Sequence, residues 1–118
     1  MRYISAEDWE LLSFFEVEPQ RLDPSVPWVY NDSVYLIEDG ELSLSCAIHP
    51  AYKDVKIILK HLTHCLYEFE AMGVKDIQVL KEKGSEVLEI TLSEQQNLRV
   101  KLRPSIEIVQ RSREKTTA

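Results

Sequence analysis

The chain has 118 residues, of which 44% are apolar and 29% charged, and its formal net charge at pH 7 is −6. This composition is that of an ordinary globular protein with one core, and it excludes the disordered and low-complexity classes. The apolar runs are only a few residues long, whereas a membrane-spanning helix needs about 20, so no membrane span is expected. The negative charge argues against a nucleic-acid partner, because proteins that bind phosphate backbones carry clustered Lys and Arg.

The N-terminus and the cysteines predict a cytoplasmic protein with reduced thiols. Acidic residues directly follow residues 1–5, where a secretory signal would need an apolar stretch. Cys46 and Cys65 are too few for a disulfide framework, and both are expected in the core as small apolar side chains. We therefore expect one globular domain over residues 1–110 and a disordered tail over residues 111–118.

A first helix is predicted over about residues 6–16. Ser5 suits the N-cap position, and Glu7 places negative charge in the first turn, where the helix dipole favours it. Ile4 and Trp9 have the spacing of a hydrophobic staple around that cap. The residues that follow predict one broad apolar face, formed by Leu11, Leu12, Phe14 and Phe15.

Residues 18–31 contain three prolines and are expected to form an ordered loop that lies against the sheet; we call this segment the belt. Its apolar side chains would be costly to leave in water, which argues against a free linker. Trp28 and Tyr30 of the belt, with Tyr35 just beyond it, are candidates for an interaction surface, because aromatic side chains anchor interfaces. The alternative is that these rings cover an open sheet face.

Two strands joined by a tight turn are predicted over residues 34–37 and 42–48. The turn centres on Asp39-Gly40, a strong signal for a short β-hairpin. In the second strand apolar residues alternate with small or polar ones, so one face is expected to meet the core and the other water or a partner. The expected inward positions are Leu42, Leu44, Cys46 and Ile48, and the expected outward positions are Glu41, Ser43, Ser45 and Ala47.

A second helix packed on the sheet is predicted over about residues 54–72. Apolar residues follow helical spacing throughout this stretch, Asp54 suits its N-cap, and Gly73 suits the position just past its end. Ile57 and Tyr67 fall outside the apolar stripe. These two side chains are therefore further candidates for an interaction surface.

The alternative for the same stretch is a β-hairpin. Residues 55–59 and 65–71 are rich in residues that favour strands. The joint between them, residues 61–64, lacks the usual turn residues, and the helix is preferred for that reason. With the hairpin, the domain would be almost all-β.

The remaining chain predicts an antiparallel meander with strands over residues 74–80, 87–92 and 98–102. Each strand alternates apolar and polar side chains and therefore has one buried face. Pro104 then breaks the ladder before a last edge strand. The predicted fold class is α+β, a single domain of mainly antiparallel strands with the two helices packed on the sheet.

The histidines and cysteines are the candidates for metal binding. Cys46-x-x-His49 and His61-x-x-His64 have residue types and spacings that occur in zinc sites. Residues three apart on a strand point to opposite faces, however, and a zinc site needs about four convergent ligands, so neither a metal site nor a catalytic site is predicted. No cofactor is predicted either, because the three glycines form no phosphate-binding loop.

The leading functional hypothesis is a small, non-catalytic protein-interaction domain with a basic partner. It rests on the acidic composition, the aromatic belt and the exposed sheet edges. The alternatives are a small-molecule-binding or sensory module with an apolar pocket between sheet and helix, and an enzyme or metal-binding protein that uses scattered His and Cys residues. A homodimer that pairs edge strands fits a chain of this size.

The predicted order of elements, helix, two strands, helix and three or four strands in a short acidic chain, resembles that of small secretion chaperones and of immunity proteins. This resemblance covers topology alone. It implies an accessory role and identifies no site residue, because a fold does not fix a function.

Overall fold

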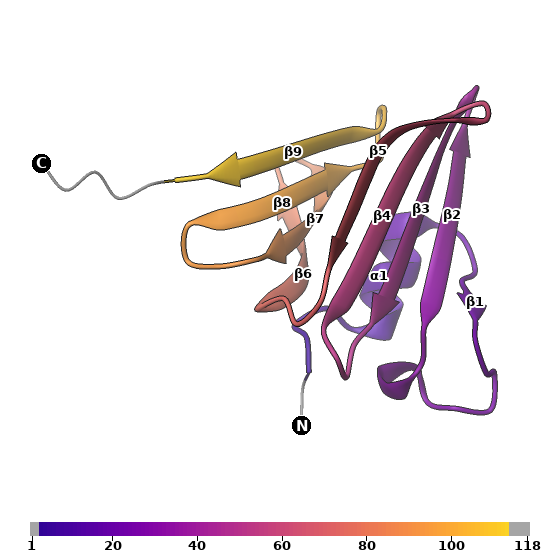
Figure 1. Ribbon diagram of the computed structural model, residues 1–118, viewed down its shortest axis with the longest axis vertical. Helices are drawn as coiled ribbons and strands as arrows, with labels where there is room; N and C mark the ends of the chain where they lie inside the picture. Colours follow the sequence, from indigo (N-terminus) through magenta and orange to yellow (C-terminus); the bar gives the residue numbers. More distant parts are fainter. Residues whose placement is uncertain (1–2, 114–118) are drawn as a thin grey trace, which may run out of the picture.

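In the computed structural model, which describes residues 3–113, one helix and two antiparallel sheets share a core (Figure 1). Both sheets are meanders in which consecutive strands are neighbours, so the fold is α+β with mostly antiparallel strands, as predicted. The first sheet consists, in spatial order, of β1 (Gln20–Arg21), β2 (Ser33–Asp39), β3 (Leu42–His49), β4 (Asp54–His61) and β5 (His64–Ala71). The second consists of β6 (Asp76–Glu82), β7 (Ser85–Thr91), β8 (Gln96–Lys101) and β9 (Glu107–Ser112).

The helix α1 (Asp8–Phe15) begins later than predicted, because Glu7 and not Ser5 caps it. The Glu7 carboxylate accepts a bond from the backbone N–H of Glu10, while the Glu10 carboxylate accepts one from the Glu7 N–H at 3.0 Å. Ser5 instead donates its N–H to the carboxylate of Asp76 on β6 at 2.7 Å. That bond holds the N-terminal segment against the second sheet.

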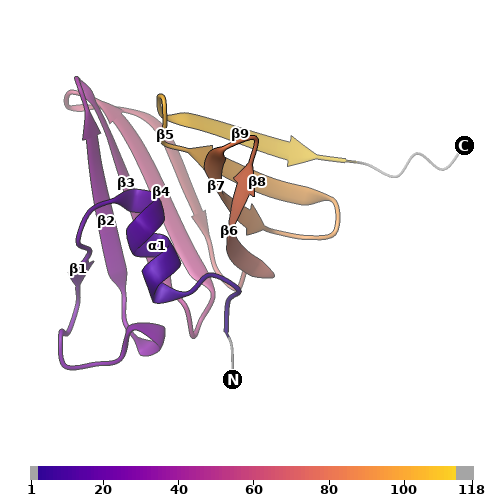
Figure 2. The ribbon, with the colours of Figure 1, turned by 180° about the vertical axis from the view of Figure 1, so that it is seen from behind.

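The apolar face of α1 supplies the centre of the core. Leu11, Phe14 and Phe15 are buried, and the Phe15 ring stacks on the ring of Tyr35 with centroids 4.3 Å apart. Trp9, on the opposite face, is 67% exposed, so the hydrophobic staple predicted for it does not form. Figure 2, seen from behind, shows α1 lying across β3 and β4.

The hairpin predicted around Asp39-Gly40 is confirmed. β2 and β3 pair in continuous register from Ser33 opposite Ile48 to Asp39 opposite Leu42. Gly40 adopts a φ of 62°, in the left-handed region that glycine enters at little cost. The alternation in β3 also holds, with Leu44, Cys46 and Ile48 buried and Ser43, Ser45 and Ala47 on the other face.

The second helix predicted over residues 54–72 is wrong, and the alternative hairpin is right. β4 pairs with β3 along one edge and with β5 along the other, so its backbone is hydrogen-bonded on both sides as a strand. The turn residue Leu62 takes a φ of 54° without being Gly or Asn. The helical spacing was misleading because apolar residues at this density fit both the helical and the strand period. Backbone pairing with the preceding strand β3 decides between the two.

The meander predicted after Gly73 is confirmed as β6 to β9. β9 ends at Ser112, so residues 111 and 112, predicted in the tail, belong to a strand; residues 114–118 lie outside the described residues. The inner face of this sheet adds to the shared core with Ile77, Leu88, Ile90, Leu98 and Val100.

The two faces of the first sheet have different surroundings. α1 lies behind β2 to β4 in Figure 1, on the face that carries the core residues of these strands. No described helix or strand lies over the opposite face, which we call the outer face. The fold therefore leaves the broad side of the five-stranded sheet available for contact.

Candidate protein-binding surface

The centre of the outer face carries small and apolar side chains. Ser43, Ser45 and Ala47 line it along β3. In the row through the sheet's middle, Ser45 pairs with Leu36 of β2, which is 49% exposed, and with Ile58 of β4. A solvated face of an antiparallel sheet is normally polar along each strand, so this composition is typical of a surface that meets a partner.

Charged residues frame the outer face on the side of β5. Lys56 of β4 lies 3.7 Å from the Glu68 carboxylate and 4.0 Å from that of Glu70. These side chains are exposed, and exposed ion pairs add little stability, so they can exchange partners cheaply. β5 itself has a neighbouring strand only on its β4 side among residues 3–113, which leaves an edge that can accept another strand.

Aromatic rings gather at one end of this sheet, and we call them the aromatic end: Tyr3, Trp28, Tyr30, His49 and Tyr52. The Tyr3 and Tyr30 rings meet edge to face with centroids 5.9 Å apart, and the His49 and Tyr52 rings stack at 4.4 Å. Tyr30 is 55% and Tyr52 69% exposed. Large exposed rings of this kind serve as anchors in protein interfaces.

A hollow of about 270 Å³ opens inside the aromatic end. It lies between the N-terminal segment and the short helix η1 (Trp28–Tyr30), which follows the belt's last proline. A backbone bond of 2.8 Å from Ala51 N–H to Val29 C=O ties η1 to the turn between β3 and β4. The principal lining residues are Tyr3, Ile4, Glu7, Trp28, Val29 and Pro50.

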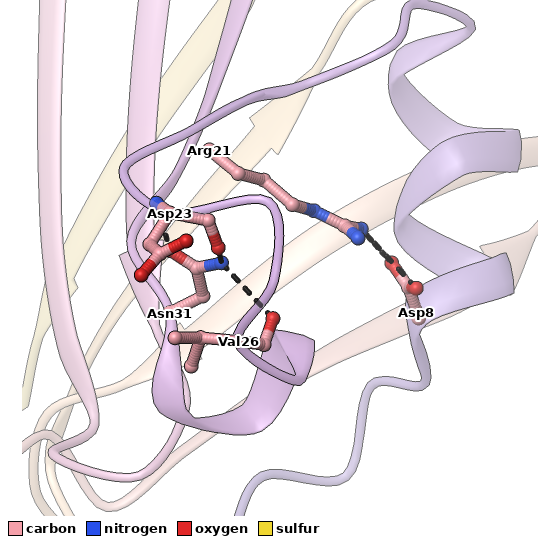
Figure 3. A network of polar contacts seen from close by, with 5 residues as sticks. All are labelled: Asp8, Arg21, Asp23, Val26 and Asn31. Carbon is pink, nitrogen blue, oxygen red and sulfur yellow. Dashed lines mark hydrogen bonds and ion pairs between the residues drawn. The ribbon is translucent and has the colours of Figure 1, made fainter.

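Polar contacts hold the belt, which carries Trp28 and Tyr30, in place (Figure 3). Arg21 donates to both carboxylate oxygens of Asp8 on α1, at 3.0 and 3.2 Å. The buried Asn31 amide donates to the carbonyls of Asp23 at 2.5 Å and Val26 at 3.2 Å, and its oxygen accepts the Asp23 N–H at 3.3 Å. η1 is therefore held in one position before any partner arrives.

Two of the five predicted interaction residues are fully buried, and a third does not lie at the aromatic end. Tyr35 and Ile57 are both 0% exposed and belong to the core, because each occupies an inward position of its strand. Burial raises the pKa of the Tyr35 phenol well above its usual range. Tyr67 is partly buried and packs against the same core. Only Trp28 and Tyr30 lie at the aromatic end.

The structure does not gather the metal candidates. Cys46 is buried on the inner face of β3, and burial raises the pKa of its thiol to about 12. His49 belongs to the aromatic end, whereas His61 and His64 face each other at the opposite tip of the sheet. Within residues 3–113, no group of three His, Cys, Asp or Glu side chains could hold a metal ion.

Three other residues were predicted wrongly or missed. Cys65, predicted in the core, is exposed on β5 because it lies beside the register shift that follows Leu59. Tyr3 and Tyr52 were missed as members of the aromatic end. No local signal marks them, since Tyr3 reaches Tyr30 only through the fold.

The net negative charge of the chain comes from the half that forms the aromatic end. Residues 1–52 contain ten acidic side chains and two basic ones, Arg2 and Arg21, whereas residues 53–118 contain ten acidic and twelve basic ones. Arg21 is already bound to Asp8. The segment that builds α1, the belt, β2 and β3 is therefore strongly negative and attracts positive charge.

Comparison with known proteins identifies a fold and no family. No protein-family model and no curated protein matches the chain. Among solved structures, it is similar to a chain of the contact-dependent growth inhibition toxin – immunity protein complex from Klebsiella pneumoniae 342, with a TM-score of 0.75 and 17% identity over 93% of this chain and 97% of that one. No helix among residues 3–113 is long and apolar enough to cross a membrane. At 17% identity the likeness shows a shared fold.

Proposed function

We propose that the protein is a non-catalytic, immunity-type domain that binds a basic toxin polypeptide and blocks its activity. The observation that carries the proposal is the outer face, which is small and apolar at its centre and has no described element over it. Contiguous apolar surface of this kind marks interaction sites on folded proteins. The partner class follows from the fold shared with a chain of a toxin – immunity protein complex.

The charge distribution supports a basic partner. The ten carboxylates of residues 1–52 create a negative potential around the aromatic end and the β2–β3 hairpin. Such a potential accelerates the encounter with a positive surface and is screened by salt, with a Debye length of about 8 Å at physiological ionic strength. The association rate with the partner should therefore fall as salt is added.

The preset position of η1 supports tight binding. Ordering a loop at an interface costs free energy that would be subtracted from the affinity. Here the bonds of Asn31 and the Arg21–Asp8 ion pair have already ordered the belt. Trp28 and Tyr30 can therefore act as anchors without that cost.

Capture from the native host followed by a growth assay tests the proposal. The tagged chain is isolated at low salt, and native mass spectrometry reports whether a second protein or a second copy is bound. The gene of any bound protein is then expressed alone and together with this chain. We expect growth arrest when the partner is expressed alone and recovery when the two are co-expressed. Arrest caused by this chain itself would refute the proposal.

A pair of arginine substitutions connects the assay to the outer face. Ser45→Arg places a large cation at the centre of that face and should abolish protection without unfolding the domain. Thr91→Arg makes a comparable change on the second sheet and should leave protection intact. Equal protection by both variants would show that the outer face is not the binding surface.

A further inference from the structure

We propose that an extended, basic segment of the bound protein adds to the first sheet as an antiparallel strand along the free edge of β5. Strand addition rests on the immunity-type function proposed above and specifies how the partner is held. β5 has eight residues and pairs with β4 alone among residues 3–113, and Figure 1 shows β8 and β9 running across its direction. Alternate residues of β5 therefore direct unpaired backbone N–H and C=O groups away from β4.

The other sheet edges among the described residues are shorter or covered. β1, at the far side of the same sheet, has only two residues, and one of them, Arg21, is bound to Asp8. β9 has six residues. β6 is held at its start by the N-terminal segment, whose Ala6 N–H donates to the Ile77 carbonyl at 2.9 Å. Proteins usually block long exposed edges with Pro or Lys, yet residues 62–74 contain neither.

The side chains of β5 favour a basic segment at this edge. Glu68 and Glu70 lie on the outer face, and their side chains are 57% and 63% exposed. Both carboxylates share one cation, Lys56 of β4, so the pair keeps a net negative charge. Side chains two residues apart on an added strand would lie opposite the two glutamates, and opposite charges in cross-strand positions are stabilising. A segment with alternating basic residues therefore matches β5.

The same glutamates argue against a second copy of this chain at the edge. The part of β5 that pairs with β4 without a register shift is residues 67–71. In a two-fold pairing of β5 with its own copy, a register centred on Glu68 or Glu70 places two copies of that residue opposite each other. A register centred on Phe69 places Glu68 opposite Glu70. Like charges directly opposite are destabilising, so a basic strand of a different protein is the better occupant.

A peptide titration that needs no partner tests the edge directly. The probe is an acetylated and amidated Thr-Lys-Val-Lys-Val-Thr peptide, added at low salt to the isotope-labelled full chain and followed by NMR. One control peptide has glutamate in place of both lysines. A second control carries N-methyl groups on its four central residues, which removes backbone donors and keeps the charge.

We expect the basic probe to shift the amide signals of residues 64–71 and to slow their hydrogen exchange. It should bind about tenfold more tightly than either control, because one control loses backbone hydrogen bonds and the other places like charges opposite each other. Equal binding of the probe and the N-methylated peptide, or shifts confined to other surfaces, would overturn strand addition at β5.

Charge-neutralising variants identify the carboxylates. Glu68→Gln combined with Glu70→Gln should weaken the basic probe about two- to tenfold, the range for two exposed ion pairs. Glu94→Gln removes a charge from the exposed turn between β7 and β8 and should change the affinity much less. An unchanged affinity of the double variant would overturn the choice of a basic segment.

The outcome is separable from that of the proposed function. Strand addition by the probe without any toxin partner in the host would support pairing at β5 and refute the immunity role. Protection of growth that survives Glu68→Lys combined with Glu70→Lys as fully as it survives Glu94→Lys would support the immunity role and refute pairing at β5.

Discussion

Replacing Asn31 with alanine tests whether the network of Figure 3 holds the belt in place. The buried amide makes three hydrogen bonds, with the Asp23 carbonyl, the Val26 carbonyl and the Asp23 N–H. Each such bond contributes about 0.5–1.5 kcal/mol, and the partners lie on a loop that water can reach, so the total loss should be about 2 kcal/mol. This corresponds to a fall in Tm of roughly 8 °C for a domain of this size.

Urea unfolding followed by circular dichroism measures the change. Asn31→Asp should be at least as destabilising, because it keeps the acceptor but points a carboxylate at two carbonyl oxygens. Asn97→Ala is the control, since the Asn97 side-chain oxygen is buried without a partner among the described residues and its removal should cost little. A loss below about 0.5 kcal/mol for Asn31→Ala would refute the role of the network.

Four further predictions concern the two cysteines, the buried Tyr35 and the first hairpin. Because the Cys46 thiol has a pKa of about 12 when folded, above its unfolded value near 9, stability should fall as pH rises from 9 to 12, and Cys46→Ala should flatten that slope in urea titrations. At pH 8, a thiol reagent should label Cys65 alone in the folded protein and both cysteines in urea. Tyr35→Phe removes a buried hydroxyl without a described partner and should leave the free energy of unfolding unchanged or raise it by up to about 1 kcal/mol. Gly40→Ala should lower it by about 1 kcal/mol through backbone strain, with no steric clash.

Elements that are specified by short sequence patterns, such as turn residues and strand alternation, could be predicted from the sequence. Asp39-Gly40 marks the first hairpin because few other dipeptides adopt the required turn, and strict alternation marks β7 and β8. The fold class follows from these elements together.

The hairpin of β4 and β5 could not be settled locally. Its apolar residues are dense enough for either period, and its turn uses Leu62 in a conformation that leucine rarely adopts. Backbone pairing with β3 decides between helix and strand. The residue pattern within 54–72 contains no information about that pairing.

The candidate surface was predictable only in part. Trp28 and Tyr30 were found because prolines and aromatic residues coincide in the belt. Tyr35 was misplaced because an aromatic residue next to the belt gives no sign of which strand face it occupies. The hollow depends on Tyr3 and Glu7 meeting η1, a contact between segments that only the tertiary structure brings together.

Hydrogen exchange on the complex with the captured partner tests the binding surface most directly. Amide exchange is compared residue by residue between the chain alone and the chain in the complex. We expect slower exchange in η1, in the turn between β3 and β4, and along β2 and the edge strand β5 of the five-stranded sheet. Slower exchange confined to β6–β9, with no change around η1 and the first sheet, would contradict the proposed surface.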